Sequence, residues 1–354
     1  VVRRLARAGL VPLLALAQAG VLLAPLYPAH YLAYYNPWLG GLPQAIATIP
    51  VGAGPVGIDR RPSTGWFYVA AMNANEIEAI DPATRRVTRV RGGMNRPIDV
   101  GISSDSRWLY VTNRGSNSLS AIDLAPPIGA EFPDWARGTG ASPYGLALRP
   151  SAANGLPVVV ANSGTSGPGT ESVISSATSA YTANVGNGPR GVVILPNGSR
   201  TYITNTSERT VTVYNGIPAL RTPPIAIISV GGAPIGIAAS PKSDRVYVAN
   251  RELNALQVID TGSNSIIATV GVGTSPVGVA EGPEGRWVYV MNEGSGNVSV
   301  VDTTTMRNIG NVGVGSSPQD AATSQDGRTI YVTNMNSNSV SVLQWPLIIV
   351  PIIR

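Results

Sequence analysis

A proline followed thirteen residues later by an aromatic residue recurs along this chain, and this repeat constrains the fold more than any other feature. Seven prolines carry it, at separations of 42, 46, 46, 45, 42 and 42 residues: Pro55, Pro97, Pro143, Pro189, Pro234, Pro276 and Pro318. Six of the seven repeats have a tyrosine at the fixed offset, and the third has Val-Val-Val-Ala-Asn at 158–162 instead. A period of 40–45 residues made of short β segments is typical of radially repeated β architectures.

The repeat that begins at Thr274 contains four short strands when it is examined by residue type. Pro276 fixes φ and Gly278 permits backbone angles that a Cβ forbids, so a tight turn precedes the first strand. Three further segments rich in β-forming residues follow, separated by turns at 283–286 and 294–297. The sequence therefore predicts an all-β chain folded as a seven-bladed β-propeller of four-stranded antiparallel blades.

The two ends of the repeat array indicate how the ring closes. The segment Ile-Ala-Thr-Ile-Pro-Val-Gly at 46–52 matches Ile-Ala-Thr-Val-Gly-Val-Gly at 267–273, which is a fourth strand, but no blade precedes it. The last repeat ends near Leu343 after three strands. We therefore expect strand 44–52 to complete blade seven, so that residues 44–345 form the propeller. The apolar tail 346–354 is expected to pair on a strand edge or to pack against a membrane partner.

Four strings resemble the YVTN-type β-propeller repeat: Leu-Tyr-Val-Thr-Asn at 109–113, Thr-Tyr-Ile-Thr-Asn at 201–205, Val-Tyr-Val-Ala-Asn at 246–250 and Ile-Tyr-Val-Thr-Asn at 330–334. The Pro-x-Gly turns and the hairpin at 325–328 belong to the same pattern. The resemblance implies a seven-bladed propeller of the kind found in surface-layer and other extracytoplasmic proteins, similar to lactonase-type propellers. It implies no single activity.

The first 43 residues differ from the repeats. Arg3, Arg4 and Arg7 precede an apolar run at 8–26, and several tyrosines follow it. Nineteen helical residues span about 28 Å, close to one hydrocarbon core. Residues 1–43 are therefore predicted to be a membrane anchor with an aromatic interfacial linker, a single transmembrane helix whose N-terminus is cytoplasmic and whose propeller lies outside the cytoplasmic membrane. A cleaved signal peptide is the alternative, and it also exports the propeller.

Composition excludes several classes of site. The chain has no cysteine and one histidine, His30, so we expect no disulfide, no metal site and no cofactor. The net charge of +5 includes three N-terminal arginines and Arg354. Because the repeats are otherwise nearly neutral, nucleic acid is not an expected partner.

Departures from the repeat point to the mouth of the propeller channel. The residue after each repeat proline faces this mouth, and there Arg190 and Gln319 are polar and Tyr144 is aromatic. The glycine two positions after the proline is replaced by Asp99 and Asp320. These five residues form a candidate mouth for a small polar ligand, although a solvated rim explains them equally simply.

Two further groups are candidate partner-binding residues. An insertion at 126–142 carries Phe132, Trp135 and Arg137, which have the aromatic and arginine character of interface anchors, unless the loop packs on itself. A basic group in the first blades is expected to face anionic headgroups or an acidic partner, unless it consists of scattered solvated side chains. Its members are Arg85, Arg86, Arg89 and Arg91.

The repeats show no histidine, no Gly-x-Ser-x-Gly elbow and no carboxylate cluster at metal-ligand spacing. The sequence therefore predicts no catalytic residues and no enzyme. It favours a non-catalytic, membrane-tethered interaction or stabilising subunit of a larger membrane complex, with other membrane-protein subunits as partners. Two alternatives stay open: an extracytoplasmic lactonase-like or other hydrolase that uses the channel mouth, and a cell-envelope or surface-layer module.

Overall fold

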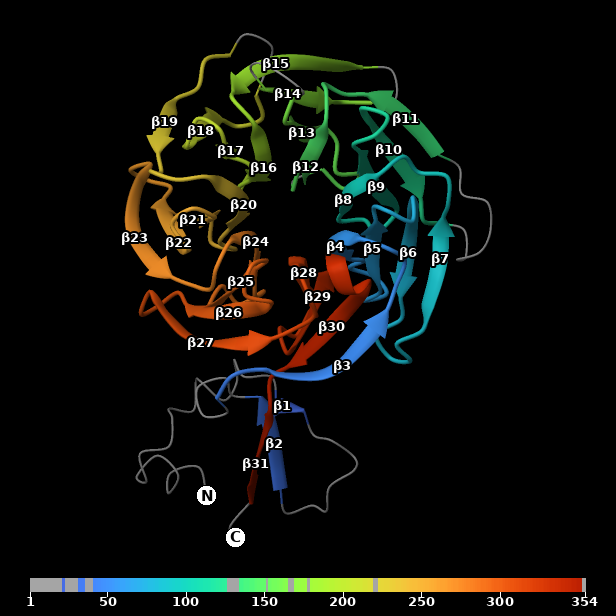
Figure 1. The fold of residues 1–354 in the computed structure, drawn as a ribbon, viewed down its shortest axis with the longest axis vertical. Helices are drawn as coiled ribbons and strands as arrows, with labels where there is room; N and C mark the ends of the chain where they lie inside the picture. Colours follow the sequence, from blue (N-terminus) through green and yellow to red (C-terminus); the bar gives the residue numbers. More distant parts are fainter. Residues whose placement is uncertain are drawn as a thin grey trace.

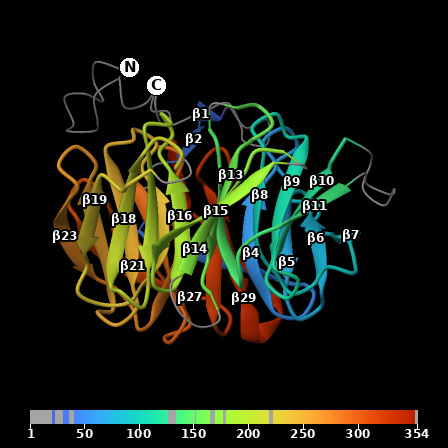
Figure 2. The same cartoon turned by 90° about the horizontal axis from the view of Figure 1, so that it is seen from above.

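The computed structural model describes residues 21–22, 31–35, 41–125, 134–150, 152–164, 169–176, 179–218 and 222–351. Its main body is a closed ring of seven four-stranded antiparallel sheets around a central channel (Figure 1). In the side view the strands run roughly along the axis of the ring (Figure 2). The all-β, seven-bladed architecture predicted from the proline period is therefore confirmed.

Each blade begins at a repeat proline, and its first strand lines the channel. Blade one is β4 (Pro55–Arg60), β5 (Phe67–Ala71), β6 (Glu76–Ile80) and β7 (Val87–Arg91). Blade two is β8 (Pro97–Ile102), β9 (Trp108–Asn113), β10 (Ser118–Asp123) and β11 (Asp134–Gly138). Blade three is β12 (Pro143–Leu148), β13 (Val158–Asn162), β14 (Gly169–Ile174) and β15 (Ala180–Gly186).

The remaining blades repeat this order. Blade four is β16 (Pro189–Ile194), β17 (Arg200–Asn205), β18 (Thr210–Asn215) and β19 (Ala226–Ser229). Blade five is β20 (Pro234–Ala239), β21 (Arg245–Asn250), β22 (Ala255–Asp260) and β23 (Ser265–Gly271). Blade six is β24 (Pro276–Glu281), β25 (Trp287–Asn292), β26 (Asn297–Asp302) and β27 (Arg307–Gly313). Blade seven is β28 (Pro318–Thr323), β29 (Thr329–Asn334), β30 (Ser339–Gln344) and the N-terminal strand β3 (Gln44–Pro50).

Closure joins the two ends of the chain within blade seven. Strand β3 pairs antiparallel with β30, from Gln44 opposite Gln344 to Pro50 opposite Ser339. A long-range pairing of this kind removes the open strand edge that a linear array would expose. Beyond the ring, β2 (Tyr31–Tyr35) lies between β1 (Val21–Leu22) and β31 (Leu347–Pro351) in a small separate sheet (Figure 1).

The small sheet bears on the helix predicted over residues 8–26. Residues 21 and 22 form strand β1 rather than helix, and the rest of that range lies outside the described residues. An apolar run does not by itself distinguish a helix from a strand that finds a pairing partner, here β2. Within the residues that the structure describes, no helix is long and apolar enough to cross a membrane. The predicted transmembrane helix is therefore not supported.

The repeated Tyr-Val-Thr-Asn string has a structural explanation. The tyrosines are buried between blades, as Tyr68 and Tyr202 illustrate. The threonine hydroxyl reaches the neighbouring blade: Thr112 donates to the Tyr144 carbonyl at 2.8 Å, and Thr333 donates to the Val56 carbonyl at 2.6 Å across the closure. These bonds fix the residue that follows each proline at the channel wall.

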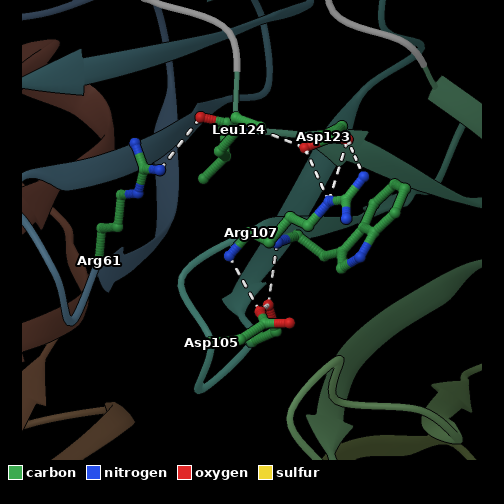
Figure 3. Close-up of polar contacts among 8 residues, drawn as sticks. Arg61, Asp105, Arg107, Asp123 and Leu124 are labelled. Carbon is green, nitrogen blue, oxygen red and sulfur yellow. Dashed lines mark hydrogen bonds and ion pairs between the residues drawn. The ribbon is translucent and has the colours of Figure 1, made fainter.

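Contacts near the rim add to the cohesion between blades. Arg107 pairs with Asp123 at 2.9 Å within blade two, and the Arg61 guanidinium of blade one donates to the Leu124 carbonyl at 3.0 Å (Figure 3). Asp302 makes an equivalent 2.9 Å ion pair with Arg286. The aspartates that recur at the ends of third strands are thus held by structural bonds.

Candidate functional site in the central channel

The inner strands enclose three cavities that succeed one another along the channel. The arginine mouth, of about 250 Å³, is lined by Arg96, Arg114, Arg190, Arg251 and Glu293, together with apolar side chains. The waist, of about 190 Å³, is lined by residues one to three positions after each repeat proline. The acid chamber, of about 560 Å³, is lined further along the same strands by Asp59, Asp99, Glu281 and Asp320. One end of the channel is therefore basic and the other acidic.

The aspartate cluster, defined as Asp59, Asp99 and Asp320, occupies the wall between blades seven, one and two. Each carboxylate accepts one backbone N–H from the following residue and one from the inner strand of the next blade. The inter-blade bonds run to Asp320 from Ile58 at 3.2 Å, to Asp59 from Ile102 at 2.8 Å, and to Asp99 from Leu146 at 2.9 Å. The cluster thus joins consecutive blades while its side chains line the acid chamber.

The repeat explains why two of these carboxyl groups face the channel. Five blades have glycine two positions after the proline, because this backbone lies against the next blade: a Cβ on Gly57 would lie 2.8 Å from the Asp99 Cα. Blades two and seven have Asp99 and Asp320 there, and both bind the N–H of the next inner strand. Asp59 stands two positions further along β4, where the other blades have only glycine, alanine or valine.

Burial changes the acidity of the cluster. Desolvation raises the pKa of Asp59 to about 6, and the backbone N–H of Ile102 opposes this rise. Burial, with a smaller contribution from the negative charge of Asp59, raises the pKa of Asp99 to about 7. Burial and then the charges of Asp99 and Asp59 raise the pKa of Asp320 to about 8. Near neutral pH the cluster therefore contains both a carboxylate and a protonated carboxyl group.

The acid chamber has one further unusual acid. Burial, together with the nearby charge of Asp244, raises the pKa of Glu281 to about 8. Its two carboxyl oxygens are buried and make no hydrogen bond. No group of three or more His, Cys, Asp or Glu side chains in the described part of the chain is placed to hold a metal ion.

The five predicted channel residues do come together, but at different depths. Tyr144, Arg190 and Gln319 line both the arginine mouth and the waist, and the Arg190 guanidinium lies 4.8 Å from the centre of the Tyr144 ring. Asp99 and Asp320 line the waist and the acid chamber and not the arginine mouth.

The predicted partner residues are dispersed. Phe132 lies outside the described residues. Trp135 and Arg137 lie on β11, and Trp135 is half-buried with its ring edge-on to Tyr110 at 6.2 Å. This tryptophan packs on its own blade, as in the alternative of a self-packed insertion.

The arginines of blade one lie around β7, outside the channel. Arg85 and Arg86 are exposed in the turn before this strand, and Arg89 makes only a 4.0 Å contact with Glu76. Arg91 is half-buried at the end of β7. Whether they bind a partner stays a prediction.

The sequence search missed Asp59, Glu281 and three arginines of the mouth. It compared only the two positions after each proline, whereas Asp59 and Glu281 stand four and five positions after it. Arg114 and Arg251 follow the repeated asparagine, and Arg96 precedes the proline. A comparison of every position of the repeat would have found all five residues.

The model of the family described as "Lactonase, 7-bladed beta-propeller" matches residues 168–306, which is less than half of the chain. No curated protein sequence matches significantly. The prediction that this chain is not an enzyme is contradicted by the lactonase match, which points toward enzymatic activity. That prediction was wrong because it relied on local motifs, whereas the aspartate cluster is assembled from three blades.

Three solved structures are similar in fold at low sequence identity. A hydrazine synthase structure of Kuenenia stuttgartiensis has a TM-score of 0.71 and 18% identity, over 82% of this chain and 95% of that chain. A streptogramin B lyase structure has a TM-score of 0.69 and 14% identity, over 85% and 97%. A chain of the mitotic checkpoint complex has a TM-score of 0.71 and 11% identity, over 91% and 95%. These likenesses show the propeller fold alone.

Proposed function

We propose that this protein is a hydrolase that opens a lactone or a similar small ester in the acid chamber. The observation that carries the proposal is the aspartate cluster, three carboxyl groups from neighbouring blades on the wall of one cavity. The match of blades three to six to a lactonase family model supports this reaction class. Because the fold itself hosts many functions, the site rather than the fold supports the choice.

The chemistry follows from the different pKa values in the cluster. Asp59, with a pKa of about 6, is mostly ionised at pH 7 and acts as the general base that takes a proton from water. The resulting hydroxide attacks the carbonyl carbon, and the acyl carbon–oxygen bond of the ring then breaks. Asp320, with a pKa of about 8, is mostly protonated and donates its proton to the leaving oxygen. The product is one hydroxy acid, and water supplies both added hydrogens and the added oxygen.

Asp99 lies on the blade that follows Asp59 and contributes to the same acid–base balance. Its pKa of about 7 lies between those of its neighbours, and its charge raises the pKa of Asp320. We infer that Asp99 keeps Asp320 protonated at neutral pH and thus acts as a positioning and tuning residue. Its replacement should lower the upper pKa of the pH–rate profile.

The cellular context stays as the sequence suggested it. We propose that residues 8–26 attach the propeller to the cytoplasmic membrane, with the propeller on its outer side and other membrane-protein subunits as neighbours. The basic run before residue 8 and the apolar character of residues 8–26 support this proposal.

The experiment measures acid release from a panel of γ- and δ-lactones by pH-stat titration. Asp320→Gly and Asp99→Gly each restore the residue that five other blades have at the same position, so both remove a carboxyl group with little change to the backbone. We expect Asp320→Gly to lower kcat/KM by about 100-fold or more. The wild-type profile should be bell-shaped, with limbs near pH 6 and pH 8.

Asp260→Asn is the matched control, because Asp260 lies in an exposed turn after β22 and bonds Ser263 there. It should leave kcat/KM within about twofold, as expected for a surface change outside the site. A wild-type protein that hydrolyses no lactone of the panel, or a folded Asp320→Gly variant with full activity, would contradict the proposed function.

A further inference from the structure

We propose that the arginine mouth is a second binding site, for a small organic anion with an apolar body. It lies at the opposite end of the waist from the acid chamber. The inference does not depend on the proposed hydrolysis, because it concerns binding alone.

The charge of the mouth favours an anion. Four arginines line it against a single acid, Glu293, which pairs with Arg251 at 2.7 Å. In the described part of the chain, no carboxylate pairs with the guanidinium groups of Arg96, Arg114 or Arg190. Guanidinium groups that lack a protein carboxylate offer a fork of N–H donors to a ligand carboxylate or phosphate.

The backbone at Arg96 is a second and independent observation. Arg96 precedes its repeat proline in a left-handed conformation, with φ of 52°. The other six blades have only small residues at this position: Gly54, Ser142, Gly188, Ala233, Ser275 and Ser317. The fold therefore does not require a long side chain here. An arginine in a conformation that favours glycine places an additional cation at the mouth.

The opposite side of the mouth is apolar, and this determines the kind of anion. Val56, Met72 and Ile98 are buried and form one cluster, against which Tyr144 and Met335 pack. The Tyr144 ring also carries the Arg190 guanidinium, so the basic and the apolar sides meet at this residue. A cavity of about 250 Å³ with these two sides matches a compact molecule better than a polypeptide segment.

Hydrogen bonds hold the polar side in place before a ligand binds. The Gln319 amide donates to the Ser317 hydroxyl at 3.2 Å and to Glu293 at 3.4 Å. Because Glu293 also holds Arg251, these residues form one connected network. A pre-ordered site loses less entropy on binding than a rim of independent, solvated side chains.

Titration calorimetry on the full chain tests the proposal with three probes: benzoate, its neutral analogue benzamide, and acetate. We expect benzoate to bind at least tenfold more tightly than either of the others, since benzamide lacks the charge and acetate lacks the apolar body. The double variant Arg114→Gln/Arg190→Gln should weaken benzoate binding at least tenfold. Its melting temperature should match that of the wild type, because neither guanidinium makes an ion pair within the described residues.

The matched control removes two charges elsewhere. Arg85→Gln/Arg86→Gln changes two exposed arginines beside β7 and should leave the Kd for benzoate within twofold. Equal weakening in both double variants would show that net charge alone attracts the probe, and would overturn the site. Equal binding of benzoate and benzamide would also overturn it. Capture by phosphatidylglycerol vesicles without benzoate binding would identify a membrane contact and refute the small-molecule proposal.

Discussion

The raised pKa of Asp320 predicts that the wild-type protein loses stability as the pH rises, and that Asp320→Asn loses less. Burial raises this pKa from 3.8 to about 8 in the folded protein. A raised folded-state pKa contributes stability that is fully present below the unfolded value and is lost as the pH rises through the folded value. The relevant window is therefore pH 4 to 9. The asparagine variant is neutral throughout this window, so it lacks this contribution to the pH dependence.

The expected magnitude follows from the same values. A pKa that moves from 3.8 to about 8 corresponds to about 6 kcal/mol at full ionisation. Asp320 is half-buried and lines the channel, so water there solvates the carboxylate and reduces this figure. We expect about 1–3 kcal/mol to be realised, in the range that protein mutations give for buried polar groups.

The assay is urea denaturation of wild type and Asp320→Asn at pH 5 and pH 9. The quantity to compare is the change in free energy of unfolding between the two pH values, because the hydrogen bond lost from Ile58 or Ala321 affects a variant similarly at both. The wild type should lose about 1–3 kcal/mol more than the variant. Equal losses within 0.5 kcal/mol, about the error of such a difference, would show that Asp320 titrates at its ordinary pKa and would refute the acid–base argument.

Three further outcomes test the closure and the rim. Ile49→Ala, in the closing strand, should cost about 2–4 kcal/mol of unfolding free energy because Ile49 is 4% exposed, whereas Ile46→Ala on the same strand, at 41% exposed, should cost under about 1 kcal/mol. Trp345→Phe should cost about 1–3 kcal/mol, since it removes the 2.8 Å bond from the buried indole to the Tyr289 hydroxyl. Arg89→Gln should change the unfolding free energy by less than about 0.5 kcal/mol, because this side chain is 71% exposed. Urea denaturation at pH 7 checks all three, and an unchanged stability in Ile49→Ala would contradict closure through β3.

The blades were predictable because each of them repeats the same local chemistry. The proline turn, the buried tyrosine and the asparagine that bonds the third strand all recur at fixed spacing, so errors at one repeat are corrected by the others. Asn113, for example, donates to Ser120, and Asn334 donates to Ser341. The third repeat, which lacks the tyrosine, still forms β13 with Asn162 at its end.

The N-terminal region was less predictable because it has no repeat with which to compare it. Its apolar run suits a membrane helix by composition and length alone. Part of it instead forms β1, which pairs with β2, and β2 in turn pairs with β31. These partners lie more than 300 residues apart along the chain, a separation over which hydrophobic periodicity carries no information.

The channel was only partly predictable, and the reason is geometric. A ring of seven blades brings equivalent positions together, so each position of the repeat forms one layer of the channel. The layer two positions after the proline alone contains five glycines and two aspartates, and it forms the waist. The sequence search compared this layer and one other, and it found Asp99 and Asp320. Asp59, Arg96 and Arg114 belong to layers that the search did not compare.

The same layers explain why a structural role and a chemical role coincide in the aspartate cluster. Where glycine is present, the inner strands approach closely, as the Val277 carbonyl does at 2.4 Å from a Cβ built on Gly236. Where aspartate is present, its carboxylate joins the strands by accepting an N–H from the next blade. The bond to the backbone fixes the carboxyl group, and the loss of water around it raises its pKa. The closure of the ring therefore holds acids in a state that acid–base chemistry at neutral pH requires.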